Sequence, residues 1–180
     1  MEETQQTPQG SGMNQKTVMI VIGVVIVLGI IAYLMGFFGG TTMFAPAGYM
    51  PGVDADKNMD GSTTYTTDEG SVTVGGNSMP ASWPSDAPTA YAGAQIIYSG
   101  DSNPTTGQSG SAVMYTTSAS VESVLEYYTS RLTAEGWTIE GTVNTGGMTA
   151  LSAKKGERTF GAYISTADGK TQVTAGVEGI

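Results

Sequence analysis

Residues 18–38 form a run of 21 residues without one charged side chain, VMIVIGVVIVLGIIAYLMGFF. A helix that rises about 1.5 Å per residue needs roughly 20 residues to cross a hydrocarbon core of about 30 Å. A core helix of this length is normally amphipathic, whereas this run is apolar on every side. The sequence therefore predicts a single transmembrane helix over 17–38 and a location in the cell membrane.

The basic residues that flank the run predict its orientation. Lys16 precedes it, and no Lys or Arg follows until Lys57. Because cytoplasmic flanks of membrane helices carry the excess of basic residues, we expect a disordered cytoplasmic tail at 1–16 and an extracytoplasmic C-terminal part. Cleavage at Ala45-Pro46-Ala47, as in a secretory signal, is the open alternative, although the apolar stretch of a signal is usually only about 7–15 residues long.

The chain beyond the run is acidic and lacks the side chains of many catalytic centres. Residues 39–180 hold 14 of the 16 Asp and Glu and 6 of the 7 Lys and Arg, for a net charge of −8. A surface of that sign repels phosphate backbones, so we expect no nucleic-acid partner. The chain has no Cys and no His, which excludes disulfides, thiol nucleophiles and Ser-His-Asp triads. Carboxylate or Ser-Lys catalysis stays open, but no phosphate loop or nucleophile elbow is present, and we predict a protein that is not an enzyme.

Composition divides the rest of the chain into a juxtamembrane linker and a folded domain. Residues 39–61 mix Gly, Pro and Asp with scattered apolar groups, which is typical of a linker. Residues 62–180 contain short β-prone runs between turn residues. These runs predict strands at 64–66, 72–74, 94–98, 112–116, 137–143, 148–153, 159–164 and 172–177.

One segment of the domain has a helical period instead. Val121, Val124, Leu125, Tyr128 and Leu132 recur at the spacing of one helix face. Ser118 or Ser120 can cap the start of this helix, and Gly136 can end it. We therefore predict an α+β domain in which one amphipathic helix packs on an antiparallel sheet, preceded by the single transmembrane helix.

Two motifs of this domain resemble a module of uncharacterised bacterial envelope proteins, which are anchored by a single span or a lipid. The first is Trp83-Pro84-Ser85-Asp86-Ala87-Pro88 followed by Gly93-Ala94, a WPxDxP…GA segment. The second is the helix end Tyr127-Tyr128…Leu132…Gly136-Trp137, a YYxxxLxxxGW pattern. The resemblance covers about 62–178 and implies an envelope location and this fold, without a known activity. The aromatic rings of both motifs are expected to pack in the core.

A turn in the linker has the pattern of a calcium loop opening. Asp56, Asn58 and Asp60 alternate before Gly61, as in D-x-N-x-D-G, so that their oxygens can converge on Ca²⁺. The twelfth position, which should supply a bidentate carboxylate, is Thr67. An ordinary Asp/Asn/Gly turn is therefore the other interpretation, and any calcium site here is expected to be weak.

The basic residues of the domain gather in one place. Lys154, Lys155 and Arg158 surround Gly156 and predict a solvated hairpin tip. We expect no cofactor, apart from the weak calcium site. The sequence favours a membrane-anchored extracytoplasmic module that binds a protein or an envelope polymer, with 18–38 in the membrane. The alternative is a calcium-stiffened surface or adhesive protein that uses the segment from Asp54 to Glu69.

Overall fold

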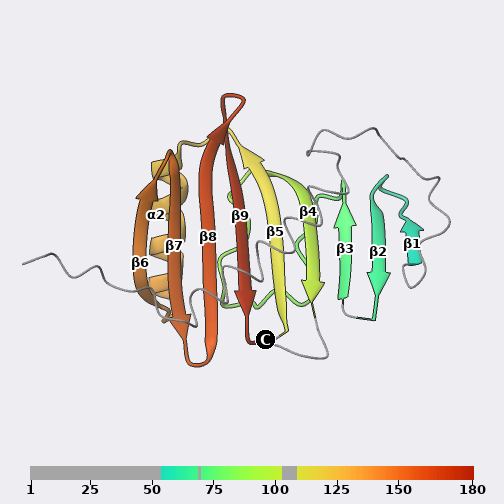
Figure 1. The fold of residues 1–180 in the computed structure, drawn as a ribbon, viewed down its shortest axis with the longest axis horizontal. Coiled ribbons are helices and arrows are strands. Elements are labelled where there is room, and N and C mark those ends of the chain that lie inside the picture. Colours follow the sequence, from blue (N-terminus) through green and yellow to red (C-terminus); the bar gives the residue numbers. More distant parts are fainter. Residues whose placement is uncertain (1–53, 69, 103–108) are drawn as a thin grey trace, which may run out of the picture. The chain divides into compact units, whose positions relative to one another are not determined.

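The strands of the domain join into one antiparallel sheet (Figure 1). The computed structural model describes residues 54–68, 70–102 and 109–180, which belong to a single compact unit of the chain. Within these ranges nine strands lie in the order β1-β2-β3-β4-β5-β9-β8-β7-β6. The bounds are β1 Asp54–Lys57, β2 Thr63–Thr67, β3 Gly70–Val74, β4 Gln95–Ser102, β5 Gly110–Thr117, β6 Thr138–Thr145, β7 Met148–Lys155, β8 Arg158–Ala167 and β9 Lys170–Glu178.

Within the sheet, one connection joins consecutive strands that are not neighbours, from β5 to β6. Strands β1 to β5 are neighbours in sequence order, and helix α2 (Val121–Ala134) then carries the chain to β6 at the far edge. Hairpins return it through β7 and β8 to β9, which pairs with β5 and joins the two halves of the sheet. The turns carry residues with positive φ, such as Gly156 (63°) and Asp168 (52°), which tight hairpin turns require.

Helix α2 begins and ends at the residues that the sequence indicates. The Ser120 hydroxyl accepts a hydrogen bond from the Ser123 amide at 3.2 Å and caps the first turn. Gly136, with a φ of 80°, ends the helix in the left-handed region that favours glycine. The face toward the sheet buries Val124, Tyr128 and Leu132, and the helix contacts β6, β7 and β8.

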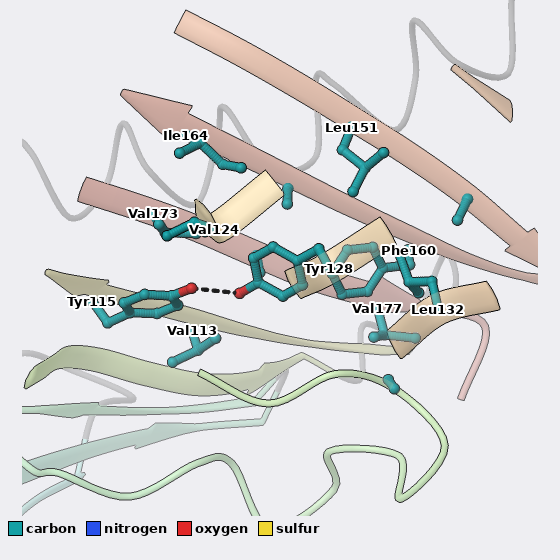
Figure 2. Packing of buried hydrophobic residues seen from close by; sticks show 14 of the residues in the cluster. Val113, Tyr115, Val124, Tyr128, Leu132, Leu151, Phe160, Ile164, Val173 and Val177 are labelled. Carbon is teal, nitrogen blue, oxygen red and sulfur yellow. Dashed lines mark hydrogen bonds between the residues drawn. The ribbon is translucent and has the colours of Figure 1, made fainter. Parts of the chain in front are cut away.

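The core lies between α2 and one face of the sheet (Figure 2). Tyr128 meets the buried Phe160 of β8, with ring centroids 5.4 Å apart. Its hydroxyl lies 2.9 Å from that of Tyr115 on β5, so these two buried hydroxyls satisfy each other. Burial raises the pKa of Tyr115 to about 12, and this pair therefore stays neutral at any physiological pH.

The predicted α+β class is wrong, because the described chain is mostly β. One helix of 14 residues does lie on an antiparallel sheet, but that sheet has nine strands, and α2 lies mainly against β6, β7 and β8, with Tyr128 reaching β5. An irregular segment, residues 75–94 between β3 and β4, is packed against part of the remaining surface instead of a second helix. We call this segment the connector. Residues 54–57, placed in the linker by the sequence, form β1.

Several expectations lie outside the described residues. They are the tail 1–16, the transmembrane helix 17–38, the first part of the linker and the Ala45-Pro46-Ala47 site. Among the described residues, no helix combines the length and apolarity that spanning a bilayer demands.

The helix offers a matched pair of truncations that tests the core. Leu132 is fully buried, whereas Leu125, which the sequence placed on the same face, is only partly buried. We expect Leu132→Ala to lower the free energy of unfolding by about 2–5 kcal/mol, because a buried cavity remains, and Leu125→Ala to lower it less. Urea denaturation followed by tryptophan fluorescence measures both. Equal losses would show that the face toward the sheet is misassigned.

Candidate functional site

The sheet face that α2 covers changes character from one half to the other. The registers place Thr73 of β3, Ser99 of β4 and the core residue Val113 of β5 on the same face. One row further, they align Ser71 and Asp101 with Ser111, which pairs with the core residue Val177. The face is therefore apolar under the helix and polar across β3 and β4.

The connector lies along this polar half and is tied to it by side-chain hydrogen bonds. The Asn77 Oδ1 accepts from the Ile96 amide at 3.1 Å. The Ser82 hydroxyl donates to the Asp101 carboxylate and also contacts the Ser111 hydroxyl. These contacts hold 76–82 beside β4, where Gly76 and Pro80 are buried and Met79 packs against the core.

A pocket of about 290 Å³ lies between the connector, the β1–β2 turn and β4. It is lined by side chains that carry hydroxyl, amide or carboxylate groups and by a small apolar wall. The polar lining is Asn58, Asp60, Ser62, Ser71, Thr73, Ser78, Ser99 and Asp101, and the wall is Met79, Pro80 and Ala81, with Gly76 and Gly100 completing the lining. None of the lining residues that the structure describes is basic.

Each of the two carboxylates of the pocket is held in place by hydrogen bonds to only one of its two oxygens. Asp60 Oδ1 accepts from the Ser62 amide at 2.9 Å and the Ser62 hydroxyl at 2.6 Å, and these bonds hold the pKa of Asp60 below its usual value. Asp101 Oδ1 accepts from Ser82 and, at 2.9 Å, from Ser111. In the described chain no other residue donates to the second oxygen, Oδ2, of either group. Each carboxylate is therefore oriented and keeps one free acceptor.

Ser99 is the least accessible unpaired group of the pocket lining. It is 7% exposed, and within the described ranges its hydroxyl has no hydrogen-bond partner. The Ser99 oxygen is nevertheless not sealed from water, because among the described residues only the Trp83 indole nitrogen is a buried side-chain polar atom without a partner. A group that enters the pocket and donates a hydrogen bond can therefore pair with the Ser99 hydroxyl.

The predicted calcium residues are only partly brought together. Asn58 and Asp60 both line the pocket, whereas Asp56 lies in the exposed strand β1 and is not among its lining residues. The Asn58 amide donates to the hydroxyls of Ser62 at 2.9 Å and Thr64 at 3.0 Å. Gly61, with a φ of 86°, ends the tight turn from β1 to β2. Two of the three candidates thus stabilise a hairpin turn, and calcium binding stays a prediction.

The sequence predicted a solvated hairpin tip at Lys154, Lys155 and Arg158, but only Lys154 is exposed, and the other two residues bind Asp86. Arg158 donates to both oxygens of Asp86, at 2.8 and 2.6 Å, and Lys155 donates to the same carboxylate at 2.7 Å. The Trp137 indole donates to the Asp86 carbonyl at 2.6 Å, and the Arg158 guanidinium lies 5.1 Å from the Trp137 ring centroid. The two envelope-module motifs therefore meet at this cluster of Asp86, Trp137, Lys155 and Arg158, which we call the clamp, and it fixes the middle of the connector on the β7–β8 hairpin.

Sequence reasoning missed Asp101 and Ser99 as site residues. The available signal was the two-residue period of side chains along β4 and β5. It places Ser99, Asp101 and Ser111 on the sheet face that carries core residues elsewhere. Polar groups in a core phase mark a surface that the fold leaves uncovered.

Comparison with known proteins gives one partial match. A family model described as START domain-like matches residues 98–172, less than half of the 180-residue chain. This match includes Ser99, Gly100 and Asp101 but none of the other residues that line the pocket. No curated protein and no solved structure matches the chain.

The clamp predicts a pH-dependent contribution to stability. The Arg158 and Lys155 hydrogen bonds hold the pKa of Asp86 well below its usual range. A carboxylate with a lowered folded-state pKa stabilises the protein above its unfolded pKa, near 4, and loses this effect as the pH falls further. We expect Asp86→Asn to lower the free energy of unfolding at pH 7 by about 1–2 kcal/mol, since the group is partly exposed.

This difference should shrink as the pH falls below about 4. Urea titrations at several pH values measure it, and Glu157→Gln in the turn of the same hairpin is the control. A difference that is constant between pH 7 and pH 3 would contradict the clamp.

Proposed function

We propose that this chain is a membrane-anchored binding module whose β domain lies outside the cell membrane and presents the pocket between β4 and the connector to a protein or envelope-polymer partner. The oriented but unpaired acceptors of Asp60, Asp101 and Ser99 carry this proposal. Asp60 is exposed and Asp101 is partly exposed, so the free oxygens of this pocket can be reached by a ligand that donates hydrogen bonds.

The membrane anchor rests on the apolar run 18–38 and on Lys16 at its N-terminal side. The resemblance of 62–178 to an envelope module supports the same placement.

A calcium-stiffened adhesive protein is the second candidate. The position of Asn58 and Asp60 at the pocket favours it, because both could present oxygens there. The binding module is preferred because the Asn58 amide and one oxygen of Asp60 are already engaged in the turn.

Site-specific photocrosslinking in the membranes of the source cell tests the binding function. A photoreactive residue at Ser78, which is exposed and lines the pocket, should give a discrete adduct. The same residue at Thr142, exposed on the edge strand β6, is the matched control. The Ser78 adduct should disappear when Asp101→Asn is added. Identical adducts from both positions, or an adduct that Asp101→Asn leaves unchanged, would contradict a partner at this pocket.

Protease added to spheroplasts tests the topology. Because Lys16 is expected to stay in the cytoplasm, the protease should remove the β domain and leave a short membrane fragment. Western blotting with tags at both ends measures this. Protection of the C-terminal tag until the membrane is lysed would reverse the orientation.

A further inference from the structure

We propose that the pocket receives a lysine side chain of a protein partner, with the ammonium group held by the free oxygens of Asp60 and Asp101 and by the Ser99 hydroxyl. This inference rests on the proposed binding function and names the chemical group that the site recognises.

The hydrogen-bonding capacity of the lining matches an ammonium group. An ammonium carries three donors and no acceptor. The pocket offers one free oxygen on each of two carboxylates and the unpaired hydroxyl of Ser99, and no described lining residue is basic. An anion would meet two negative charges without a counter-charge, so the lining excludes phosphate and carboxylate ligands.

The same geometry favours lysine over arginine. A guanidinium binds best when both oxygens of one carboxylate are free, because its donors form a planar fork. Asp60 and Asp101 each use Oδ1 within the protein and present only Oδ2. Two separate single acceptors suit the compact, rotatable charge of an ammonium group.

The apolar wall and the size of the pocket favour a side chain over a free amine or an amino sugar. Met79, Pro80 and Ala81 form this wall beside the polar groups, and an aliphatic lysine stem can lie along it. The volume of about 290 Å³ is at the lower end of small-molecule sites, which span about 300–1,000 Å³. One long side chain fits such a space.

Charge also favours a basic protein as the partner. The chain outside 1–38 has a net charge of −8 and would attract a basic surface over some distance, so a lysine would be steered to the pocket. A divalent cation is the rival occupant. Calcium requires about six to eight oxygens, and the described residues contain no cluster of three acidic ligands.

Ligand-observed NMR on the full-length chain in detergent tests the proposal at constant ionic strength. The probes are Nα-acetyl-lysine methylamide, its Nε-acetylated form, the corresponding arginine amide, glucosamine and calcium chloride. We expect the lysine amide to bind about tenfold more tightly than the Nε-acetylated, arginine and glucosamine probes, since one charged hydrogen bond is worth about that factor. Equal binding of any of these three, or displacement of the lysine amide by micromolar calcium, would overturn it.

Variants locate the binding. Asp101→Asn keeps the acceptor for Ser82 and Ser111 but removes the charge, and should weaken the lysine amide about tenfold or more. Ser99→Ala should weaken it roughly three- to tenfold. Asp168→Asn, which makes the same charge change in an exposed turn, is the control and should change nothing. Equal effects of Asp101→Asn and Asp168→Asn would place the binding elsewhere.

The outcome separates this inference from the function on which it rests. If Ser78 crosslinks a partner in a way that depends on Asp101, while no lysine probe binds, then the binding module stands and the lysine assignment fails. If the lysine amide binds but Ser78 gives no specific adduct, then the chemistry of the pocket stands and its proposed role fails.

Discussion

The width of one helix limits how much of this sheet can be covered. A helix with its side chains is about 10–12 Å wide, and strands lie about 4.8 Å apart, so one helix lying along the strands covers two or three of them. Helix α2 lies mainly against β6, β7 and β8, which agrees with that limit, and only the long side chain of Tyr128 is shown to reach further, to Tyr115 on β5. The same face of the sheet continues over β9, β5, β4 and β3. No second helix of the described chain covers its polar half on β3 and β4, and this leaves room for the pocket.

The connector solves the covering problem in a different way from the helix. It has no regular backbone pairing of its own over most of its length, so it depends on fixed points along the sheet. Asn77 and Ser82 bind it to β4 and β5, while Asp86 binds it to the β7–β8 hairpin. Near these polar contacts Gly76 and Pro80 are buried and Met79 packs against the core, so this end of the connector covers only part of the sheet. The pocket is the space that remains between these contacts, and its apolar wall comes from the connector residues 79–81.

The sequence predicts the parts of this fold that are governed by short-range patterns. The 3.6-residue period of Val121, Val124 and Tyr128, together with Ser120 and Gly136, predicted α2 nearly to its ends. Strand β1 could not be predicted from its residues, DADK, because Asp and Lys are rarely found in strands; pairing with β2 holds it in place. The α+β class failed for a related reason, since a helix count says nothing about how many strands share one sheet.

The site was harder to predict than the fold, because it depends on registers between distant segments. Asp60 and Asp101 are far apart in the sequence, and only the pairing of β2 with β3 and of β3 with β4 places them at one pocket. The Asp86 clamp is similar, since its three charged residues come from a Pro-rich motif and a hairpin that are separate in sequence. In each case the residue types were visible, but the partner of each residue was set by the topology.

The polar half of the sheet face indicates a function, because its residues are not those that would stabilise the domain most. Positions on the same sheet face as the core residues Val113 and Val177 would stabilise the domain most if they held apolar, covered side chains, as the positions under α2 do. Ser99 instead keeps an unpaired hydroxyl in a position that is 7% exposed, and Asp101 keeps a charge beside it. A polar side chain at such a position stabilises the domain less than the apolar side chain that could stand there. Ser82 and Ser111 donate to one oxygen of Asp101 and orient it, while its second oxygen and the Ser99 hydroxyl have no partner in the described chain, and this is the arrangement expected of a site that is completed by a ligand.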